Sequence, residues 1–207
     1  MSKVVRVSRK SSRKARHRAL KIIHDAQKEL RKKGYRFSFQ LVGSGKWCLI
    51  FKDKNDWYDL DYQLMLTKNC KKYLLDNPIQ IRKDFIEAFK ANTNDSEEEI
   101  DRNTAITVKD KLNKFSFDFV IFAYFPDNKF ILRKNNNSSK NGYTWNQYSE
   151  FELCEKFKEL LWYQKREIIE NYVVPAKIKA KLNGDKRKSF QIFLDEINRW
   201  GQKNDLW

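Results

Sequence analysis

The sequence predicts an α+β fold, in which a mixed sheet with flanking helices follows a basic N-terminal helix and precedes a helical C-terminal part. Strand-like segments gather in the middle of the chain, whereas apolar residues at helical spacing dominate both ends. Hydrophobic residues make up 41% of the 207 residues and aromatic residues 14%. This composition supports a packed core in one substantial domain, or in a small core with a helical appendage.

The N-terminal helix is expected over residues 8–33, because its alanine, isoleucine and leucine residues recur at helical spacing. Gly34 then ends it as a C-cap glycine. Residues 35–42 alternate as a strand does, with Tyr35, Phe37, Phe39 and Leu41 on one face.

The remaining elements follow from the same periodicities and from turn residues. Strands are expected at 59–66, 104–108, 115–125 and 130–133, helices at 78–91 and 189–200, and loops at 92–103 and 134–142. A further helix begins after Ser149 and Glu152, which have capping-box spacing, and stops near Pro175. Loop 134–142 is the best linker candidate, and the predicted division is 1–33, 34–143 and 144–207.

Positive charge is concentrated at the N-terminus. The chain carries 43 Lys and Arg against 27 Asp and Glu, a net charge of +16. Residues 1–36 alone hold 14 basic and two acidic residues. Such a field favours a polyanion, and RNA is the expected partner. The residues expected to contact RNA phosphates are Arg9, Lys10, Arg13, Lys14, Arg16 and Arg18. The alternative is a solvated basic helix.

Several classes of protein are disfavoured. Cys48, Cys70 and Cys154 are widely spaced and accompany only two histidines, which suggests neither a zinc site nor a disulfide framework. The thiols are expected as small core residues in a reducing cytoplasm. No apolar run has the length of a membrane span, and the N-terminus lacks the apolar region of a secretory signal. We therefore expect a cytoplasmic protein without a membrane partner.

Two carboxylates open the strand predicted at 59–66. Side chains alternate along a strand, so Asp59 and Asp61 share one face. Two neighbouring carboxylates repel each other unless a cation lies between them. Mg²⁺ suits such a pair because it takes oxygen ligands and keeps waters that substrate phosphates replace. The alternative is a solvated strand end, because the motif is short and common.

A third carboxylate lies within a very apolar strand. Asp118 is on the face opposite Phe115, Phe117, Phe119 and Ile121. An unpaired carboxylate there costs several kcal/mol, so it needs a partner. Both a metal shared with Asp59 and Asp61 and a Lys or Arg side chain remain open.

A glycine turn precedes these strands. The backbone at Gly43-Ser44 can approach a phosphate closely, and its amides with the Ser44 hydroxyl can bind triphosphate oxygens. A P-loop is excluded, because Trp47 stands where Ser or Thr is required and Gln40 where the first glycine belongs. Taken alone, the turn is an ordinary loop.

Together these features resemble the polymerase-β-like nucleotidyltransferase superfamily: a strand, Gly43-Ser44, a strand with Asp59 and Asp61, and a later strand with Asp118. The resemblance covers residues 37–120. It departs from the family at 47–49, where Trp-Cys-Leu replaces a second Gly-Ser or Gly-Thr step.

The resemblance implies two metal ions, Mg²⁺ or Mn²⁺, on Asp59, Asp61 and Asp118. Gly43, Ser44 and Lys46 would bind the β- and γ-phosphates of an NTP. Lys188 and Ser189, with Lys186 and Arg187, would contact the triphosphate at the start of the last helix, although an exposed basic helix start is an equal alternative.

The expected function is transfer of a nucleoside monophosphate from an NTP to an acceptor, first of all RNA, with a tRNA end as one candidate. A nucleotide second-messenger synthase is the second hypothesis. A non-catalytic RNA- or partner-binding module on the same fold is the third, and simple salt bridges of the three aspartates are the fourth. A regulatory protein partner stays open.

Overall fold

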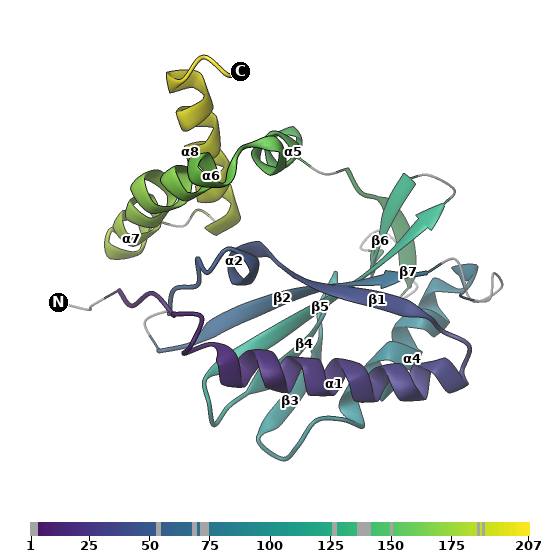
Figure 1. Ribbon diagram of the computed structural model, residues 1–207. Helices are drawn as coiled ribbons and strands as arrows, with labels where there is room; N and C mark the ends of the chain where they lie inside the picture. The colour runs from purple at the N-terminus through teal and green to yellow at the C-terminus, as the bar shows by residue number, and fades with distance from the viewer. Residues whose placement is uncertain are drawn as a thin grey trace. The chain divides into compact units, whose positions relative to one another are not determined.

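The computed structural model describes residues 4–52, 55–67, 70, 75–125, 128–135, 142–149, 151–185, 187 and 189–207. These residues form two compact units. One unit is Val7–Tyr148, and the other joins Met1–Arg6 to Ser149–Trp207. The N-terminal helix α1 therefore belongs to the same unit as the sheet (Figure 1).

The larger unit contains a mixed sheet, as predicted. Its strands are β1 (Phe37–Val42), β2 (Tyr58–Leu66), β3 (Glu97–Asp101), β4 (Ala105–Asp110), β5 (Phe115–Phe125), β6 (Asn128–Lys134) and β7 (Tyr143–Gln147). The order is β1-β2-β5-β4-β3, with β6 paired to β5 and β7 to β6. Strands β2 and β5 are parallel, and the other pairs are antiparallel. A parallel pair needs a crossover connection, which here includes helix α4 (Pro78–Lys90).

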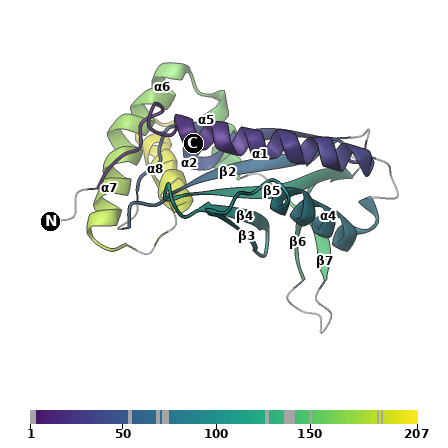
Figure 2. The same cartoon turned by 90° about the horizontal axis from the view of Figure 1, so that it is seen from below.

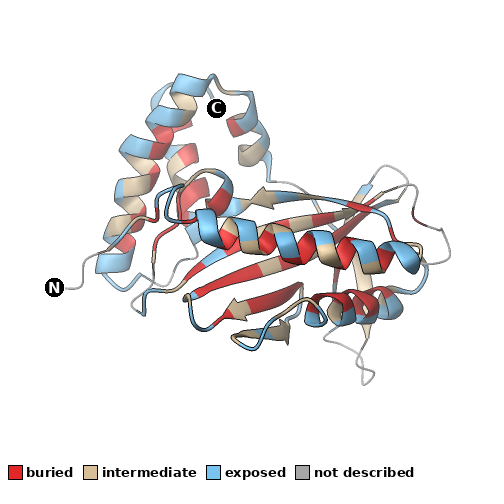
Figure 3. Ribbon diagram, turned by 60° about the horizontal axis from the view of Figure 1, so that its bottom comes forward, coloured by how far each residue is buried: buried red, intermediate tan, exposed pale blue. Residues whose placement is uncertain are grey.

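Helices α1 (Arg13–Lys32) and α4 lie on one face of the sheet (Figure 2). The apolar stripe predicted for α1 is fully buried, as the red stripe along that helix shows in Figure 3. On α4, Phe89 stacks on Phe119 of β5 with ring centroids 4.5 Å apart. Ile79 is 39% exposed, although it is one of the apolar residues of α4, because it lies at the first turn of the helix.

Two strands of the sheet were not predicted. Segment 92–103 contains β3, whose sequence Glu-Glu-Glu-Ile-Asp lacks the apolar alternation of a strand. Its acidic side chains have basic partners on the helices: Glu97 pairs with Arg18 of α1, and Asp101 pairs with the fully buried Arg82 of α4. Strand β7 follows loop 134–142, which therefore connects two paired strands and is not a linker between units. Residues 136–141 of that loop lie outside the described residues.

The smaller unit is helical, as predicted, but its segments differ from the expected ones. They are a helix α5 (Glu152–Glu159), a helix α6 (Trp162–Glu167), a π-helical segment η1 (Ile168–Val173), a helix α7 (Val174–Leu182) and a helix α8 (Ser189–Lys203). Phe151, and not Ser149, is the N-cap of α5, so the expected capping box is absent there. The helix also continues past Pro175. Pro175 lies in the first turn of α7, directly after the π-helical segment η1, and proline is tolerated best at the first turn of a helix.

All three cysteines are described, and none of them is part of a disulfide bond. Cys70 is buried, as expected, whereas Cys48 and Cys154 are only partly buried. Among the described residues, no helix has both the length and the apolar character needed to cross a membrane.

Candidate active site

The three predicted carboxylates lie on neighbouring strands. In the parallel pairing of β2 with β5, Asp61 is directly opposite Asp118, and Asp59 is opposite Ser116. Alternation along β2 turns Leu60 and Tyr62 into the core, where they are at most 2% exposed. Asp59 and Asp61 therefore point to the other face together with Asp118. The structure thus brings together carboxylates that are far apart in the sequence.

Hydroxyl groups, and not cations, contact two of these carboxylates. The Ser116 hydroxyl donates to Oδ1 of Asp59, and Thr107 Oγ1 donates to Oδ1 of Asp118 over 2.6 Å. In the described part of the chain, no Lys or Arg forms an ion pair with Asp59, Asp61 or Asp118. The salt-bridge alternative therefore finds no support in these residues.

Burial and mutual repulsion raise the pKa of two of these carboxylates, Asp61 and Asp118. Burial, and then the charges of Asp118 and Asp59, raise the pKa of Asp61 to about 7. Burial and the charge of Asp59 also raise the pKa of Asp118, although its bond from Thr107 opposes that shift. A group whose pKa is raised in this way is stabilised when a cation binds beside it.

The donor set fits a metal site that substrate completes. Within the described residues, no three carboxylate, imidazole or thiol groups form a finished metal-binding cluster. Mg²⁺ does not require one, because it is usually held by one or two carboxylates with waters and substrate phosphates. Asp59, Asp61 and Asp118 offer oxygen ligands of that kind, so they are the residues that would hold Mg²⁺ or Mn²⁺.

The predicted Gly-Ser turn is a one-turn helix, α2 (Gly43–Lys46), whose first residue lies close to Asp61. Gly43 has a φ of +58°, and a Cβ there would lie 2.8 Å from Oδ2 of Asp61. A Cβ on Gly45 would lie 2.9 Å from a methyl carbon of Leu41. The position of Gly43 therefore favours glycine both by its backbone conformation and by its closeness to Asp61, whereas at Gly45 a side chain would require the Leu41 side chain to move.

Solved structures with the same fold are found among bacterial CD-NTases, although no family model and no curated protein matches the sequence. Vibrio cholerae DncV in its GTP-bound form aligns with a TM-score of 0.60 and 15% identity, over 94% of this chain and 52% of that one. The STING-associated CdnE c-di-GMP synthase of Capnocytophaga granulosa aligns with a TM-score of 0.66 and 17% identity, over 94% of this chain and 61% of that one. This chain has the polymerase-β-like nucleotidyltransferase fold.

This chain spans between half and two thirds of the length of these two nucleotidyltransferase-fold proteins. A third structure is described as V. cholerae DncV cyclic AMP-GMP synthase with the linear intermediate 5′-pppA(3′,5′)pG. Its TM-score is 0.58 at 13% identity, over 87% of this chain and 51% of that chain. At such low identity these similarities concern the fold.

The residues predicted to bind the triphosphate lie in two different parts of the chain. Ser44 accepts a backbone bond from Leu49 over 2.8 Å, and the exposed Lys46 places Nζ 5.3 Å from the ring centroid of Trp47. Ser189 begins α8 in the other unit, and Lys186 and Lys188 lie outside the described residues. Their contact with an NTP stays a prediction. Arg187 is already paired, because its guanidinium contacts Asp185 at 2.7 Å and Asp195 at 2.9 Å.

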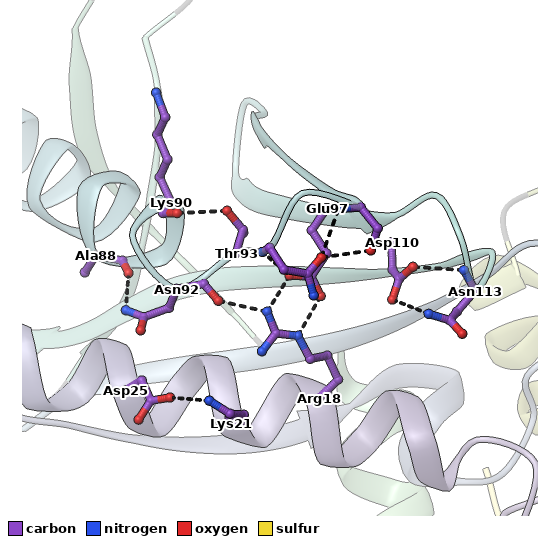
Figure 4. Close-up of polar contacts among 12 residues, drawn as sticks. Arg18, Lys21, Asp25, Ala88, Lys90, Asn92, Thr93, Glu97, Asp110 and Asn113 are labelled. Carbon is purple, nitrogen blue, oxygen red and sulfur yellow. Dashed lines mark hydrogen bonds and ion pairs between the residues drawn. The ribbon is translucent and has the colours of Figure 1, made fainter.

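The six basic residues predicted to bind RNA divide into two groups. The side chains of Arg9, Lys10, Arg13 and Lys14 are exposed, and Lys14 donates to Asn113 over 2.6 Å. Arg16 and Arg18 are only partly exposed, and their guanidinium groups bind backbone carbonyls or a carboxylate of the sheet unit. Arg16 donates to the Gly45 carbonyl of α2, and Arg18 binds Glu97 and the Asn92 carbonyl (Figure 4).

Two features escaped the prediction from sequence. Gln63 follows Asp61 on the same face of β2, and its amide oxygen accepts from Gln40 and from Lys129. The Lys129 ammonium also lies over the rings of Phe122 and Tyr148, at 4.6 and 5.0 Å. The alternation that identified Asp59 and Asp61 extends to Gln63, but only strand pairing brings the other residues beside it.

The second feature is a buried lysine in the smaller unit. Lys177 of α7 is 4% exposed, and burial together with the charges of Lys181 and Arg6 lowers its pKa to about 8. A buried cation held near other cations is costly, and strongly shifted pKa values are concentrated at functional sites. Its position within an ordinary-looking Lys-rich helix gave no signal in the sequence.

Proposed function

We propose that this chain is a metal-dependent nucleotidyltransferase that joins a nucleoside monophosphate from an NTP to the hydroxyl of a second nucleotide. The observation that carries the proposal is the meeting of Asp59, Asp61 and Asp118 on one sheet face without a described cationic partner. The similar structures are described as synthases of cyclic AMP-GMP and of c-di-GMP, which supports a nucleotide as the acceptor.

The reaction is a substitution at the α-phosphorus of the NTP. The acceptor hydroxyl oxygen forms a bond to that phosphorus, the bond to the bridging oxygen breaks, and pyrophosphate leaves. Bound to the carboxylates, Mg²⁺ or Mn²⁺ would neutralise the triphosphate and lower the pKa of the acceptor hydroxyl.

The chain's own groups orient these partners. Thr107 fixes one oxygen of Asp118, which leaves the other oxygen to receive the proton of the acceptor hydroxyl. Ser116 fixes Asp59 in the same way. Gly43 and Ser44, beside Asp61, would face the β- and γ-phosphates, with Lys46 at the surface. Gln63 lies two residues after Asp61 on β2, and its side-chain amide is bonded to that of Gln40. These two amides offer hydrogen-bond donors and acceptors for the edge of a nucleotide base.

An incubation with labelled substrate tests the proposal. The purified chain is mixed with Mg²⁺ or Mn²⁺ and each α-³²P-labelled NTP, with and without total RNA. We expect a labelled soluble product that does not need RNA and is absent from an Asp59→Ala/Asp61→Ala variant. If no labelled product forms either with or without RNA, the proposal is contradicted. That result would favour a non-catalytic module or an enzyme that needs a partner protein.

RNA is the second candidate acceptor, and the four exposed basic side chains Arg9, Lys10, Arg13 and Lys14 favour it. Replacement of all four by Gln should abolish RNA labelling and reduce the salt dependence of RNA binding, by a slope of about one for each lost phosphate contact. Turnover of NTP alone should persist in that variant. A nucleotide acceptor predicts instead that the four replacements leave the amount and nature of the product unchanged.

A further inference from the structure

We infer that Arg16 is a positioning residue, which holds helix α2 against Asp61 and thereby sets the arrangement of the metal-binding carboxylates. The inference rests on the proposed function and deepens it. It gives Arg16 a role different from the RNA contact that its place in a basic helix predicted.

Two nitrogen atoms of the Arg16 guanidinium donate hydrogen bonds to other residues. Nη2 donates to the carbonyl oxygen of Gly45 over 2.8 Å, and Nε donates to the hydroxyl of Ser12 over 3.0 Å. Ser12 is fully buried, and its hydroxyl also donates to the Arg9 carbonyl. The side chain therefore spans from the first residues of α1 to α2, and it is held in one direction before any ligand binds.

A hydrogen bond to the Gly45 carbonyl oxygen can strongly influence the position of α2. This carbonyl lies near the end of a single helical turn, where it also accepts from the backbone amides of Trp47, the C-cap residue, and of Cys48, the latter over 3.4 Å. Cys48 itself has a φ of +56°, which is uncommon for a residue with a side chain. A four-residue helix has little stability of its own. A charged donor on this carbonyl is therefore an important restraint on the turn.

The turn transmits that restraint to the carboxylates. Gly43 lies so close to Asp61 that a single added carbon would contact Oδ2 at 2.8 Å, and Gly45 packs equally closely on Leu41. Asp61 is the carboxylate opposite Asp118 in the strand pairing. Movement of α2 thus allows Asp61 to turn away from Asp118, without any change in the strands themselves.

Arg18 provides a matched control. It lies on the same helix, two positions further along, and its guanidinium is just as firmly bound, to Glu97 at 2.5 and 2.6 Å and to the Asn92 carbonyl at 2.9 Å. Figure 4 shows Arg18 directed toward Glu97 and Asn92, which lie at the start of β3 and just after α4, and not in α2. Loss of Arg18 should therefore lower stability without changing the carboxylates.

The experiment measures Mn²⁺ binding by electron paramagnetic resonance in the full chain, together with transfer kinetics. For Arg16→Met we expect about tenfold weaker Mn²⁺ binding and a tenfold or larger fall in kcat. Hydrogen exchange should accelerate at the Cys48 and Leu49 amides, which bind the Gly45 and Ser44 carbonyls. Arg16→Lys, which keeps one charged donor, should recover part of each loss. Arg18→Met should lower the melting temperature but retain Mn²⁺ binding and kcat.

The outcomes separate the two claims. If the parent chain binds Mn²⁺ and transfers nucleotides while Arg16→Met behaves like the parent, the positioning role is wrong and the proposed function stands. If Arg18→Met loses Mn²⁺ binding as strongly as Arg16→Met, the effect is general destabilisation, and the inference is overturned. If the parent chain neither binds Mn²⁺ nor transfers nucleotides, both claims fail.

Discussion

The two faces of strands β2 and β5 carry opposite chemistry although they share the same backbone. On the face toward α1 and α4, Leu60, Phe117 and Phe119 are fully buried. On the other face, Asp59, Asp61 and Asp118 lie together, and burial and mutual charge raise the pKa of two of them. The first face supplies stability through apolar burial, whereas the second stores electrostatic repulsion that a cation would relieve. Substitutions on the two faces should therefore affect different measurements.

The largest expected effect is on activity at the carboxylate face. Asp118→Asn keeps the shape of the side chain but removes its charge and its capacity to accept a proton. We expect transfer to fall by at least about a thousandfold, equivalent to about 4 kcal/mol in the activation barrier. The melting temperature should stay the same or rise, because the repulsion from Asp59 is removed. Initial rates and thermal melts measure both quantities, and activity within tenfold of the parent would show that Asp118 is not catalytic.

On the core face the effect should be on stability. Phe119→Ala removes a ring that stacks on Phe89 and packs near Tyr62, so we expect a loss of about 3–5 kcal/mol in unfolding free energy. Val120→Ala is the matched control, since the side chain of this neighbouring residue points to the opposite face and is only partly buried. Urea denaturation should give a loss of less than about 1.5 kcal/mol for that control. Equal losses in the two variants would contradict the assignment of the faces.

Lys177 extends the comparison to the smaller unit, where a buried cation is held near Lys181 and Arg6. Its pKa is about 8 in the folded chain, against an ordinary lysine value of 10.5. Lys177→Met keeps the apolar stem and removes the charge, so at pH 7 we expect up to about 3 kcal/mol of additional stability.

The sign of the pH dependence follows from proton uptake. Between about pH 8 and 10.5 the unfolded chain retains the Lys177 proton that the folded chain has lost. The stability contribution of Lys177 therefore improves as the pH rises, and the advantage of Lys177→Met should vanish near pH 10.5. Denaturation at about pH 7 and pH 10 measures this, with the exposed Lys179→Met as control. An advantage that is the same at both pH values would show that charge burial is not its cause.

The smallest expected change in stability concerns two glycines with the same backbone strain. Gly43 and Gly184 have φ values of +58° and +67°, but only at Gly43 would a Cβ meet a neighbour. Ala at either position should cost about 1–2 kcal/mol. Gly43→Ala should in addition lower kcat by tenfold or more, because it displaces Asp61. Thermal melts and rate measurements on both variants test this. Full activity in Gly43→Ala would show that the contact of α2 with Asp61 does not affect catalysis.

Local periodicity predicted much of the fold. The apolar stripe of α1, the bounds of β5 and the shared face of Asp59 and Asp61 each depend on residues close in sequence. Strand β3 was missed because its side chains are mainly acidic, and the energy that keeps them in a strand comes from Arg18 and Arg82 on two helices. The predicted break at Pro175 was wrong for a similar reason, since the π-helical segment before it is not encoded by a local pattern.

The sequence by itself determined that this chain has an aromatic-rich mixed α+β core, a basic N-terminal helix, and three aspartates placed on strands. These properties follow from alternation and composition, which every short segment carries on its own. Only the tertiary structure decided that Asp61 lies opposite Asp118, that Gly43 touches Asp61, and that Arg16 and Arg18 serve different partners. Such choices depend on which distant segments pair, and pairing is set by the packing of the whole sheet unit.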